Sequence, residues 1–266
     1  MKKEKGFTLI ELLVVISIIA MLLSILMPAL AKVKYQALRV VGTSNIRGQL
    51  VIQQLYATDN NGKYHPHDDY SPEYVRSNWA DNSMYAAVLD YIENVDIMNC
   101  PVLKQQSRRG GSFEMFRPDY YDLGFGGNWK AFTTEDEMLA NLPSIFGSYM
   151  WLANYRCTWP SGTPTEPVFN FTDVATGISV NEVPWPKKGS EATSRTAMIV
   201  HRISDVSGYF FDHSHKGAGF SPAPNGFVDF ATTVDNPIGH GDGSVNVTMK
   251  SDMKPRAETT AGIIYY

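Results

Sequence analysis

Apolar residues fill the first part of the chain almost without interruption. From Leu9 to Leu30 every side chain is apolar or weakly polar except Glu11. An α-helix rises 1.5 Å per residue, so about 20 such residues cross the hydrocarbon core of a bilayer. The pattern therefore predicts a membrane-spanning helix. An ionised carboxylate in hydrocarbon is costly unless something pairs with it, which makes Glu11 a candidate functional residue.

The helical pattern continues beyond Pro28 in a different form. Apolar and small residues recur at three- to four-residue spacing from Val33 to Leu55, which is typical of a helix with one face on a sheet. The triplet 60–62, Asn-Asn-Gly, favours a left-handed helix cap, and Pro66 cannot continue a helix. We therefore expect a helix of about 50 residues, from which Pro28 removes one backbone hydrogen bond.

The rest of the chain mixes a second helical pattern, at 79–93, with strand patterns. The strand patterns are short segments rich in β-branched and aromatic residues, separated by Gly, Pro, Ser and Thr. Strands without alternating helices favour antiparallel pairing over a parallel α/β core. The sequence thus predicts an α+β fold, with a long N-terminal helix packed on an antiparallel β-sheet. The strand segments are 148–155, 196–203, 208–213, 226–234 and 244–250.

Length and charge narrow the classes of function. The chain has 266 residues and a formal net charge of -4. About 200 residues beyond the N-terminal segment suffice for one domain with a sizeable core. The charge argues against a nucleic-acid partner, because no basic stripe is present to neutralise phosphates. The basic residues Lys2, Lys3 and Lys5 stay cytoplasmic and place the C-terminal domain outside, where thiols oxidise.

Candidate chemistry outside the N-terminus is sparse. Cys100 and Cys157 lack the spacing of a zinc site, which leaves a disulfide between them as an option. Histidines lie near acids at 65–69, 212–215 and 240–242, but without the spacing of a metal-hydrolase motif, so we expect polar turns there. No nucleophile elbow, phosphate-binding loop or dinucleotide fingerprint occurs, and we do not expect an enzyme.

The N-terminal string KGFTLIELLVVISIIAML resembles the signal of type IV prepilins and type II secretion pseudopilins. The resemblance implies that a prepilin peptidase cleaves after Gly6 and methylates the new amine of Phe7. It also implies that Glu11 pairs with that amine on an adjacent subunit during assembly. A subunit without this ion pair would leave a buried charge unpaired, so the pair would fix the register between subunits. A cleaved secretory signal and a plain membrane anchor are the other interpretations of the same segment.

The resemblance also implies an organisation and a function. The segments are a cleaved leader (1–6), a transmembrane and assembly helix (7–30), an amphipathic helix that continues into the domain (31–57) and an extracytoplasmic globular domain (58–266). Filament subunits of the family also carry a proline at the place of Pro28. The implied protein sits in the inner membrane, with prepilin peptidase and other copies or related pseudopilins as partners. It would polymerise into a type IV pilus or a secretion pseudopilus. A membrane-anchored surface protein that binds glycans through its aromatic residues is the alternative.

Later segments resemble a large pilin-like family abundant in Planctomycetes and Lentisphaerae, which carries a C-terminal His-x9-Asp-Gly signature. Asp242 and Gly243 fit the end of that signature, but Thr232 stands where the histidine belongs, so its role in this chain stays open. Pseudopilins similar to this chain bind calcium in C-terminal loops, which makes Asp235 and Asp242 candidate calcium ligands. We expect no other metal and no other cofactor. The segments that carry this resemblance are 44–66, 91–103, 148–155 and 239–247.

Overall fold

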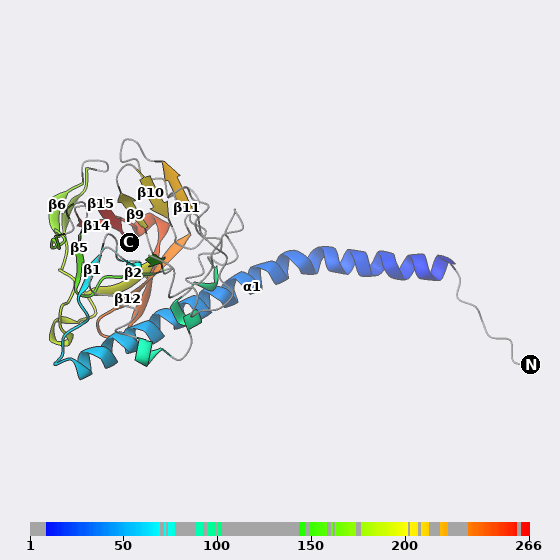
Figure 1. Ribbon diagram of the computed structural model, residues 1–266. Helices are drawn as coiled ribbons and strands as arrows, with labels where there is room; N and C mark the ends of the chain where they lie inside the picture. Colours follow the sequence, from blue (N-terminus) through cyan, green and yellow to red (C-terminus); the bar gives the residue numbers. More distant parts are fainter. Residues whose placement is uncertain are drawn as a thin grey trace, which may run out of the picture. The chain divides into compact units, whose positions relative to one another are not determined.

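The computed structural model of the chain contains one long helix followed by short strands (Figure 1). The chain forms two compact units, Met1–Val40 and Val41–Tyr266. The second unit includes the last turns of the helix, which the sequence predicts to continue into the globular domain. The residues described are 9–69, 72, 74–77, 89–92, 95–98, 100–102, 144–146, 149–158, 161, 163–173, 177–201, 203–206, 209–212, 219–222, 234–259 and 262–266.

Helix α1 (Leu9–Asp59) is 51 residues long and includes Pro28, which confirms the predicted N-terminal helix. Its end also follows the prediction. Asn61 and Gly62 have φ values of 57° and 76°, and the Gly62 N–H donates to the carbonyl of Ala57 at 2.7 Å. A left-handed backbone at this point satisfies a carbonyl of the last helical turn and stops the helix.

Most of the secondary structure described beyond α1 consists of short strands and 3₁₀ helices. The 3₁₀ helices are η1 (Leu89–Tyr91), η2 (Val95–Met98), η4 (Gly189–Glu191) and η5 (Lys250–Asp252). The strands are β1 (His67–Asp69), β2 (Tyr74–Ser77), β3 (Ser144–Phe146), β4 (Tyr149–Trp151), β5 (Tyr155–Cys157), β6 (Asn170–Thr172), β7 (Ser179–Asn181), β8 (Ala197–His201), β9 (Ile203–Val206), β10 (Tyr209–Asp212), β11 (Gly219–Pro222), β12 (Asp235–His240), β13 (Val245–Met249), β14 (Pro255–Glu258) and β15 (Gly262–Tyr265).

Among the described residues the strands form two larger sheets and three strand pairs. The larger sheets have the orders β11-β10-β9-β15-β14 and β13-β12-β8-β4. The pairs are β1-β5, β2-β3 and β6-β7. The pairings are antiparallel except that of β1 with β5. The architecture is therefore α+β with antiparallel sheets, as predicted, although the strands are divided among several sheets.

Most of the predicted strand segments contain strands. Segment 148–155 holds β4 and the start of β5, segment 196–203 holds β8, and segments 208–213 and 244–250 hold β10 and β13. Segment 226–234 lies outside the described residues except for its last residue. The predicted helix at 79–93 also lies outside them, apart from residues 89–92, which include η1.

The last turns of α1 pack closely on the four-stranded sheet. Ile46 and Leu50 of the helix are buried, at 0% and 2% exposure. Both face Gly239 of β12, where an added Cβ would lie 2.7 Å from Ile46 Cγ2 and 3.1 Å from Leu50 Cδ1. A glycine in this central strand therefore permits the close approach of helix and sheet.

Hydrogen bonds from β4 fasten the helix to the same face. Trp151 Nε1 donates to Gln49 Oε1 at 2.6 Å, and Gln49 Nε2 donates to the carbonyl of Ile97 at 2.7 Å. The Tyr149 hydroxyl donates to the carbonyl of Gly42 at 3.3 Å. Buried polar groups are stable only with such partners, and here both ends of a fully buried amide have them.

The opposite face of this sheet forms the main hydrophobic core. Side chains alternate along a strand, so Met150 points away from the helix while its neighbours in β4 point toward it. Met150 pairs in register with Val200, and Val200 with Ile238; all three are buried in one cluster. The cluster continues into the neighbouring segments with Leu152, Tyr155, Cys157, Trp185, Ala197, Ala257, Ile264 and Tyr266.

The two cysteines lie on opposite faces of the sheet and are not joined by a disulfide. Cys100 lies beside the hydroxyl of Tyr149, on the helix side; burial, followed by this thiol, raises the pKa of that tyrosine. Cys157 belongs to the core cluster on the other side, with Met150. A packed strand therefore separates the two thiols, and the disulfide considered from the sequence is not formed in this structure.

Candidate functional site

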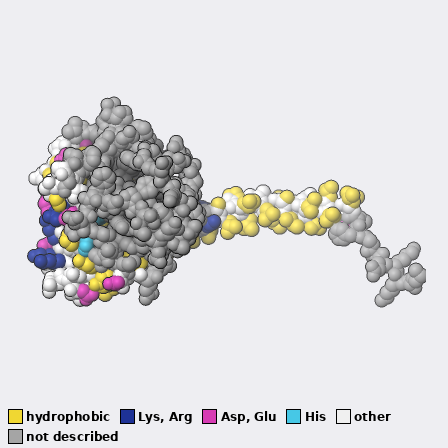
Figure 2. All heavy atoms as spheres, viewed as in Figure 1, with side chains coloured by type: hydrophobic (Ala, Val, Ile, Leu, Met, Phe, Trp, Pro, Cys, Tyr) yellow, Lys and Arg dark blue, Asp and Glu magenta, His cyan; other side chains and the backbone are white. Residues whose placement is uncertain are grey.

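The N-terminal unit exposes a long apolar surface. The described side chains from residue 9 to residue 34 are all exposed, among them Leu9 at 78% and Leu26 at 58%. Figure 2 shows apolar side chains along this part of the helix. Among the described residues α1 is the one helix long and apolar enough to cross a membrane. An apolar surface of this extent indicates contact with lipid or with another protein.

The weakly polar side chains in this segment are satisfied within the helix. The Ser17 hydroxyl donates to the carbonyl of Leu13 at 2.8 Å, and the Ser24 hydroxyl donates to the carbonyl of Met21 at 2.7 Å. Pro28 lies inside α1 without ending it. Internal satisfaction of polar groups is the condition for placing a segment in hydrocarbon, and the described part of this segment meets it at both serines.

Glu11 lies in the first turn of α1 and is exposed. The N-terminal end of a helix carries a partial positive charge, which favours a carboxylate at this position. The predicted processing residues Gly6 and Phe7 lie outside the described residues. The structure therefore places the predicted assembly carboxylate at the start of the apolar helix, a few residues after the predicted cleavage point.

A second apolar stripe runs along the outer side of α1 within the domain unit. Val41, Val51 and Leu55 are 48%, 56% and 47% exposed, whereas Ile46 and Leu50 between them are buried against the sheet. Val51 and Leu55 are four residues apart and lie on one side of the helix. This outer stripe, defined by Val41, Val51 and Leu55, is available for contact with another protein.

Asp68 and His67 have partners inside the protein. Asp68 forms a two-point ion pair with Arg156, whose Nε donates to Oδ1 at 2.7 Å. His67 is buried, and its Nδ1 lies 3.0 Å from the carbonyl of Trp151. Within the described residues no three His, Cys, Asp or Glu side chains are grouped as metal ligands. The histidines at 213 and 215 lie outside the described residues.

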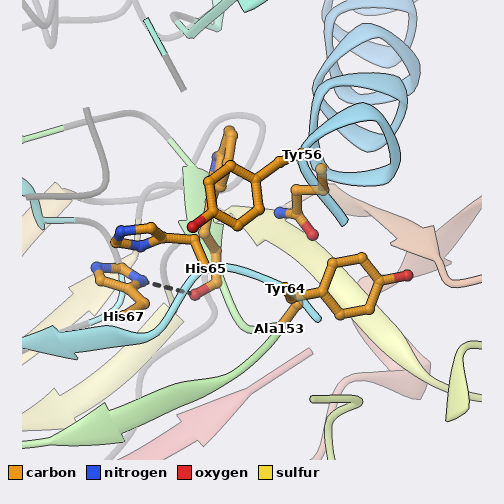
Figure 3. A pocket seen from close by; sticks show the side chains of 7 residues that line it. Tyr56, Tyr64, His65, His67 and Ala153 are labelled. Atoms are coloured by element: carbon orange, nitrogen blue, oxygen red, sulfur yellow. Dashed lines mark hydrogen bonds between the residues drawn. The ribbon is translucent and has the colours of Figure 1, made fainter. Parts of the chain in front are cut away.

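A pocket opens beside the end of α1. It measures about 260 Å³ including its opening, and Figure 3 shows Tyr56 and His65 next to each other in it, with the ring of Tyr64 pointing away from the histidines. Burial, followed by the proximity of His67, lowers the pKa of His65 to about 4, so this imidazole is neutral near pH 7. The residues that line the pocket are Gln53, Tyr56, Tyr64, His65, His67, Trp151 and Ala153.

The two candidate calcium ligands lie at opposite ends of β12. Asp235 begins the strand and is buried, whereas Asp242 follows its end and is exposed, so about 20 Å of extended chain separates them. The Asp242 carboxylate accepts hydrogen bonds from the Ser244 amide at 3.0 Å and hydroxyl at 2.7 Å, which lower its pKa. Gly243 has φ of 85°. The Asp-Gly pair thus forms the turn between β12 and β13, and the structure does not bring the two aspartates together.

The tryptophans described do not form a surface platform. Trp151 and Trp185 are 4% and 5% exposed. Trp185 belongs to the core cluster, and its Nε1 donates to the Tyr266 hydroxyl at 3.0 Å. Trp129 and Trp159 lie outside the described residues. A glycan site built on exposed tryptophans is therefore not formed by the pair at 151 and 185.

Comparison with known proteins gives a family match, at the N-terminus, and similarity to a pilus component. The family model of the prokaryotic N-terminal methylation motif matches residues 1–27. The type IV wide pilus major component PilA4 of Thermus thermophilus is 44% identical over 61 residues, which are 23% of this chain and 47% of that protein. The chain thus spans about half the length of this relative. No solved structure matches the chain. The chain carries the prokaryotic N-terminal methylation motif at residues 1–27 and, over 61 residues, is similar to a type IV pilus component.

Proposed function

We propose that the chain is a structural subunit of a type IV pilus or a type II secretion pseudopilus. A prepilin peptidase removes residues 1–6 and methylates the amine of Phe7. Before assembly the subunit is anchored in the inner membrane with its domain outside the cytoplasm, and it then polymerises through α1. The observation that carries this proposal is the methylation motif at 1–27, which leads into an exposed apolar helix. No catalytic role is assigned to the domain.

Glu11 has a defined part in the proposed assembly. Cleavage after Gly6 creates an amine on Phe7, four residues before Glu11. In a filament the apolar helices pack side by side, where a cation from a neighbour stabilises a carboxylate among them. The Phe7 amine of the adjacent subunit supplies that cation. The ion pair favours one register over others because a shifted subunit leaves both charges unpaired.

The outer stripe of Val41, Val51 and Leu55 supports a second contact between subunits. The first unit exposes apolar residues that the membrane covers before assembly, whereas the outer stripe belongs to the domain unit, outside the membrane. Burying it against another subunit would add hydrophobic stabilisation of about 25 cal/mol per Å². We assign this stripe to contacts with neighbouring copies or related pseudopilins.

Membership of the Planctomycetes and Lentisphaerae pilin-like family is part of the proposal. The support is the position of Asp242 and Gly243 in the β12–β13 turn. The Asp242 carboxylate accepts a hydrogen bond from the Ser244 amide, and Gly243 adopts a positive φ, so the turn itself requires both residue types. The proposal assigns these residues to the turn rather than to chemistry.

The test is a set of substitutions at Glu11 in a strain that assembles filaments. Glu11→Ala should be cleaved and inserted normally but should fail to polymerise, because the amine of Phe7 loses its partner at a cost of about 3 kcal/mol or more per contact. Glu11→Gln keeps the shape and should also be defective. Ser17→Ala is the matched control, since its hydroxyl bonds only within the helix. Filament yield is measured beside an immunoblot for the mature chain. Assembly of Glu11→Ala at the wild-type level would refute the proposed pairing.

A further inference from the structure

The pocket beside the end of α1 contains polar atoms that the protein itself does not satisfy. Gln53 is 5% exposed, yet neither its Oε1 nor its Nε2 has a hydrogen-bond partner. The Nδ1 of His65, which lines the same pocket, is also buried without a partner. Native proteins rarely leave a buried amide unsatisfied, because it forfeits its hydrogen bonds to water. These atoms therefore require a hydrogen-bond partner from outside the chain.

Gln49 is a buried glutamine whose side-chain amide is fully hydrogen-bonded within the protein, in contrast to Gln53. It lies one turn earlier on the same side of α1 and is completely buried. Its amide nitrogen donates to the carbonyl of Ile97, and its oxygen accepts from Trp151. Both of its hydrogen-bonding ends are used by the protein, whereas both ends of Gln53 are left for something else. The difference separates a structural amide from an amide that faces a pocket.

The lining of the pocket selects a neutral partner. It consists of Gln, Tyr, His, Trp and Ala side chains and contains no carboxylate, ammonium or guanidinium group. Gln53 offers a carbonyl oxygen as acceptor and an NH₂ group as donor, and burial keeps His65 neutral near pH 7. A hydroxyl group both donates and accepts, so it satisfies such a set without bringing a charge into the pocket.

The size of the pocket and its aromatic side chains narrow the ligand further. The free space among the lining side chains takes only one water-sized group, so a single hydroxyl enters while the rest of the ligand stays outside. Tyr56 is half-buried, with its ring 5.3 Å from His65 and 6.3 Å from Tyr91 (Figure 3 shows the first pair). The Tyr91 hydroxyl donates to Asp59 at 2.7 Å, which holds this ring in place. Aromatic rings at this point supply apolar contact for a carbon skeleton.

We propose that this pocket binds a saccharide or similar polyol through one neutral hydroxyl arm. The hydroxyl donates to Gln53 Oε1 and accepts from Gln53 Nε2 or bonds to His65 Nδ1, and the carbon skeleton rests on Tyr56. The site lies in the domain unit, and none of its residues belongs to the apolar segment at residues 9–30. The inference does not depend on filament assembly, so either proposal can fail without the other.

The test uses the full-length chain in a detergent that carries no sugar head group. The probes are glycerol, methyl α-glucopyranoside and methyl β-galactopyranoside, each followed by saturation-transfer NMR. Gln53→Met keeps the side-chain length and removes both polar atoms. Gln54→Met is the matched control, because Gln54 is the adjacent helix residue, is exposed and does not line the pocket. Tyr56→Leu tests the aromatic contact separately.

The expected result is saturable binding of at least one probe. Gln53→Met should weaken it about tenfold, as loss of one to two hydrogen bonds implies, while Gln54→Met leaves it unchanged. Thermal unfolding without probe serves as the folding check: Gln53→Met should melt no lower than the wild type, since its amide has no protein partner to lose. Binding by none of the probes, which would leave the pocket to water alone, overturns the proposal. Equal binding by the wild type and Gln53→Met overturns it too.

Discussion

Replacing Gly239 by alanine tests how closely the helix and the sheet are packed. Gly239 lies in β12, between β13 and β8, opposite the buried side of α1. A Cβ at this position would come within 2.7 Å of Ile46 Cγ2 and within 3.1 and 3.3 Å of the two terminal methyl carbons of Leu50. Real Cβ atoms do not approach a carbon that closely, so the helix or the two side chains must move.

The size of the effect follows from overpacking. One added methyl group in a filled core costs about 1–3 kcal/mol, because neighbours leave their preferred rotamers and the backbone shifts. For a unit of this size each kcal/mol lowers the melting temperature by about 2–4 °C. We therefore expect Gly239→Ala to melt about 2–12 °C below the wild type. Ile46→Ala in the same chain should reduce the further penalty of Gly239→Ala, since the nearest contact atom is then absent.

The assay is thermal unfolding of the full chain in detergent, followed by near-UV circular dichroism. Gly189→Ala is the matched control, because an added Cβ there meets only one atom, at 3.9 Å. It should change the melting temperature little, or raise it slightly through the loss of backbone freedom in the unfolded chain. If Gly239→Ala and Gly189→Ala melt alike, the close contact between α1 and β12 is not part of the folded protein.

Three further predictions concern buried groups. Gln49→Leu leaves the Trp151 N–H and the Ile97 carbonyl unsatisfied and should lower the free energy of unfolding by about 2–4 kcal/mol in urea. Burial depresses the pKa of His65 from 6.5 to about 4, so its neutral form stabilises the fold above pH 6.5 and that contribution should be lost as the pH falls from 6.5 to 4. His65→Asn should therefore flatten the plot of urea midpoint against pH between pH 4 and 6.5. An unchanged plot would contradict this prediction. Cys100 and Cys157 should both react with an alkylating agent in denaturant without reductant, and a mass showing two unlabelled cysteines would contradict their separation.

The helix was predictable because its signals are local. The apolar run, its continuation with helical spacing and the stop at Asn61 and Gly62 are all readable over a few turns, and the structure follows them to Asp59. Residues 31–57 read as an amphipathic helix that continues into the domain, and the structure buries Ile46 and Leu50 of this segment in the unit that begins at Val41.

Strand β12 escaped prediction because its sequence, Asp-Asn-Pro-Ile-Gly-His, lacks strand propensity. Proline and glycine normally argue against a central strand. Here pairing with β8 begins at Ile238, after Pro237, and Gly239 is needed for the approach of the helix. Tertiary packing therefore overrides local propensity at this strand.

The pocket and the separation of the cysteines also depend on tertiary structure. The pocket combines Gln53 of α1 with His65 after the helix and Trp151 of β4, and no spacing along the chain connects these three. The faces of the two cysteines are decided by the alternation at Tyr149 and Met150, which the sequence shows only once the strand register is known. The sequence predicts polar turns for the histidines near 65–67, whereas the unsatisfied amide of Gln53 in the same pocket carries no sequence signal.

The most direct test of the proposed subunit role is the N-terminus of the chain recovered from sheared filaments. Cells that express it are sheared, the filament and membrane fractions are separated, and each is analysed by peptide mass spectrometry. We predict a mature chain in the filament fraction that begins with N-methylated Phe7. A chain found only in the membrane fraction and still beginning at Met1 would contradict both its processing and its polymerisation.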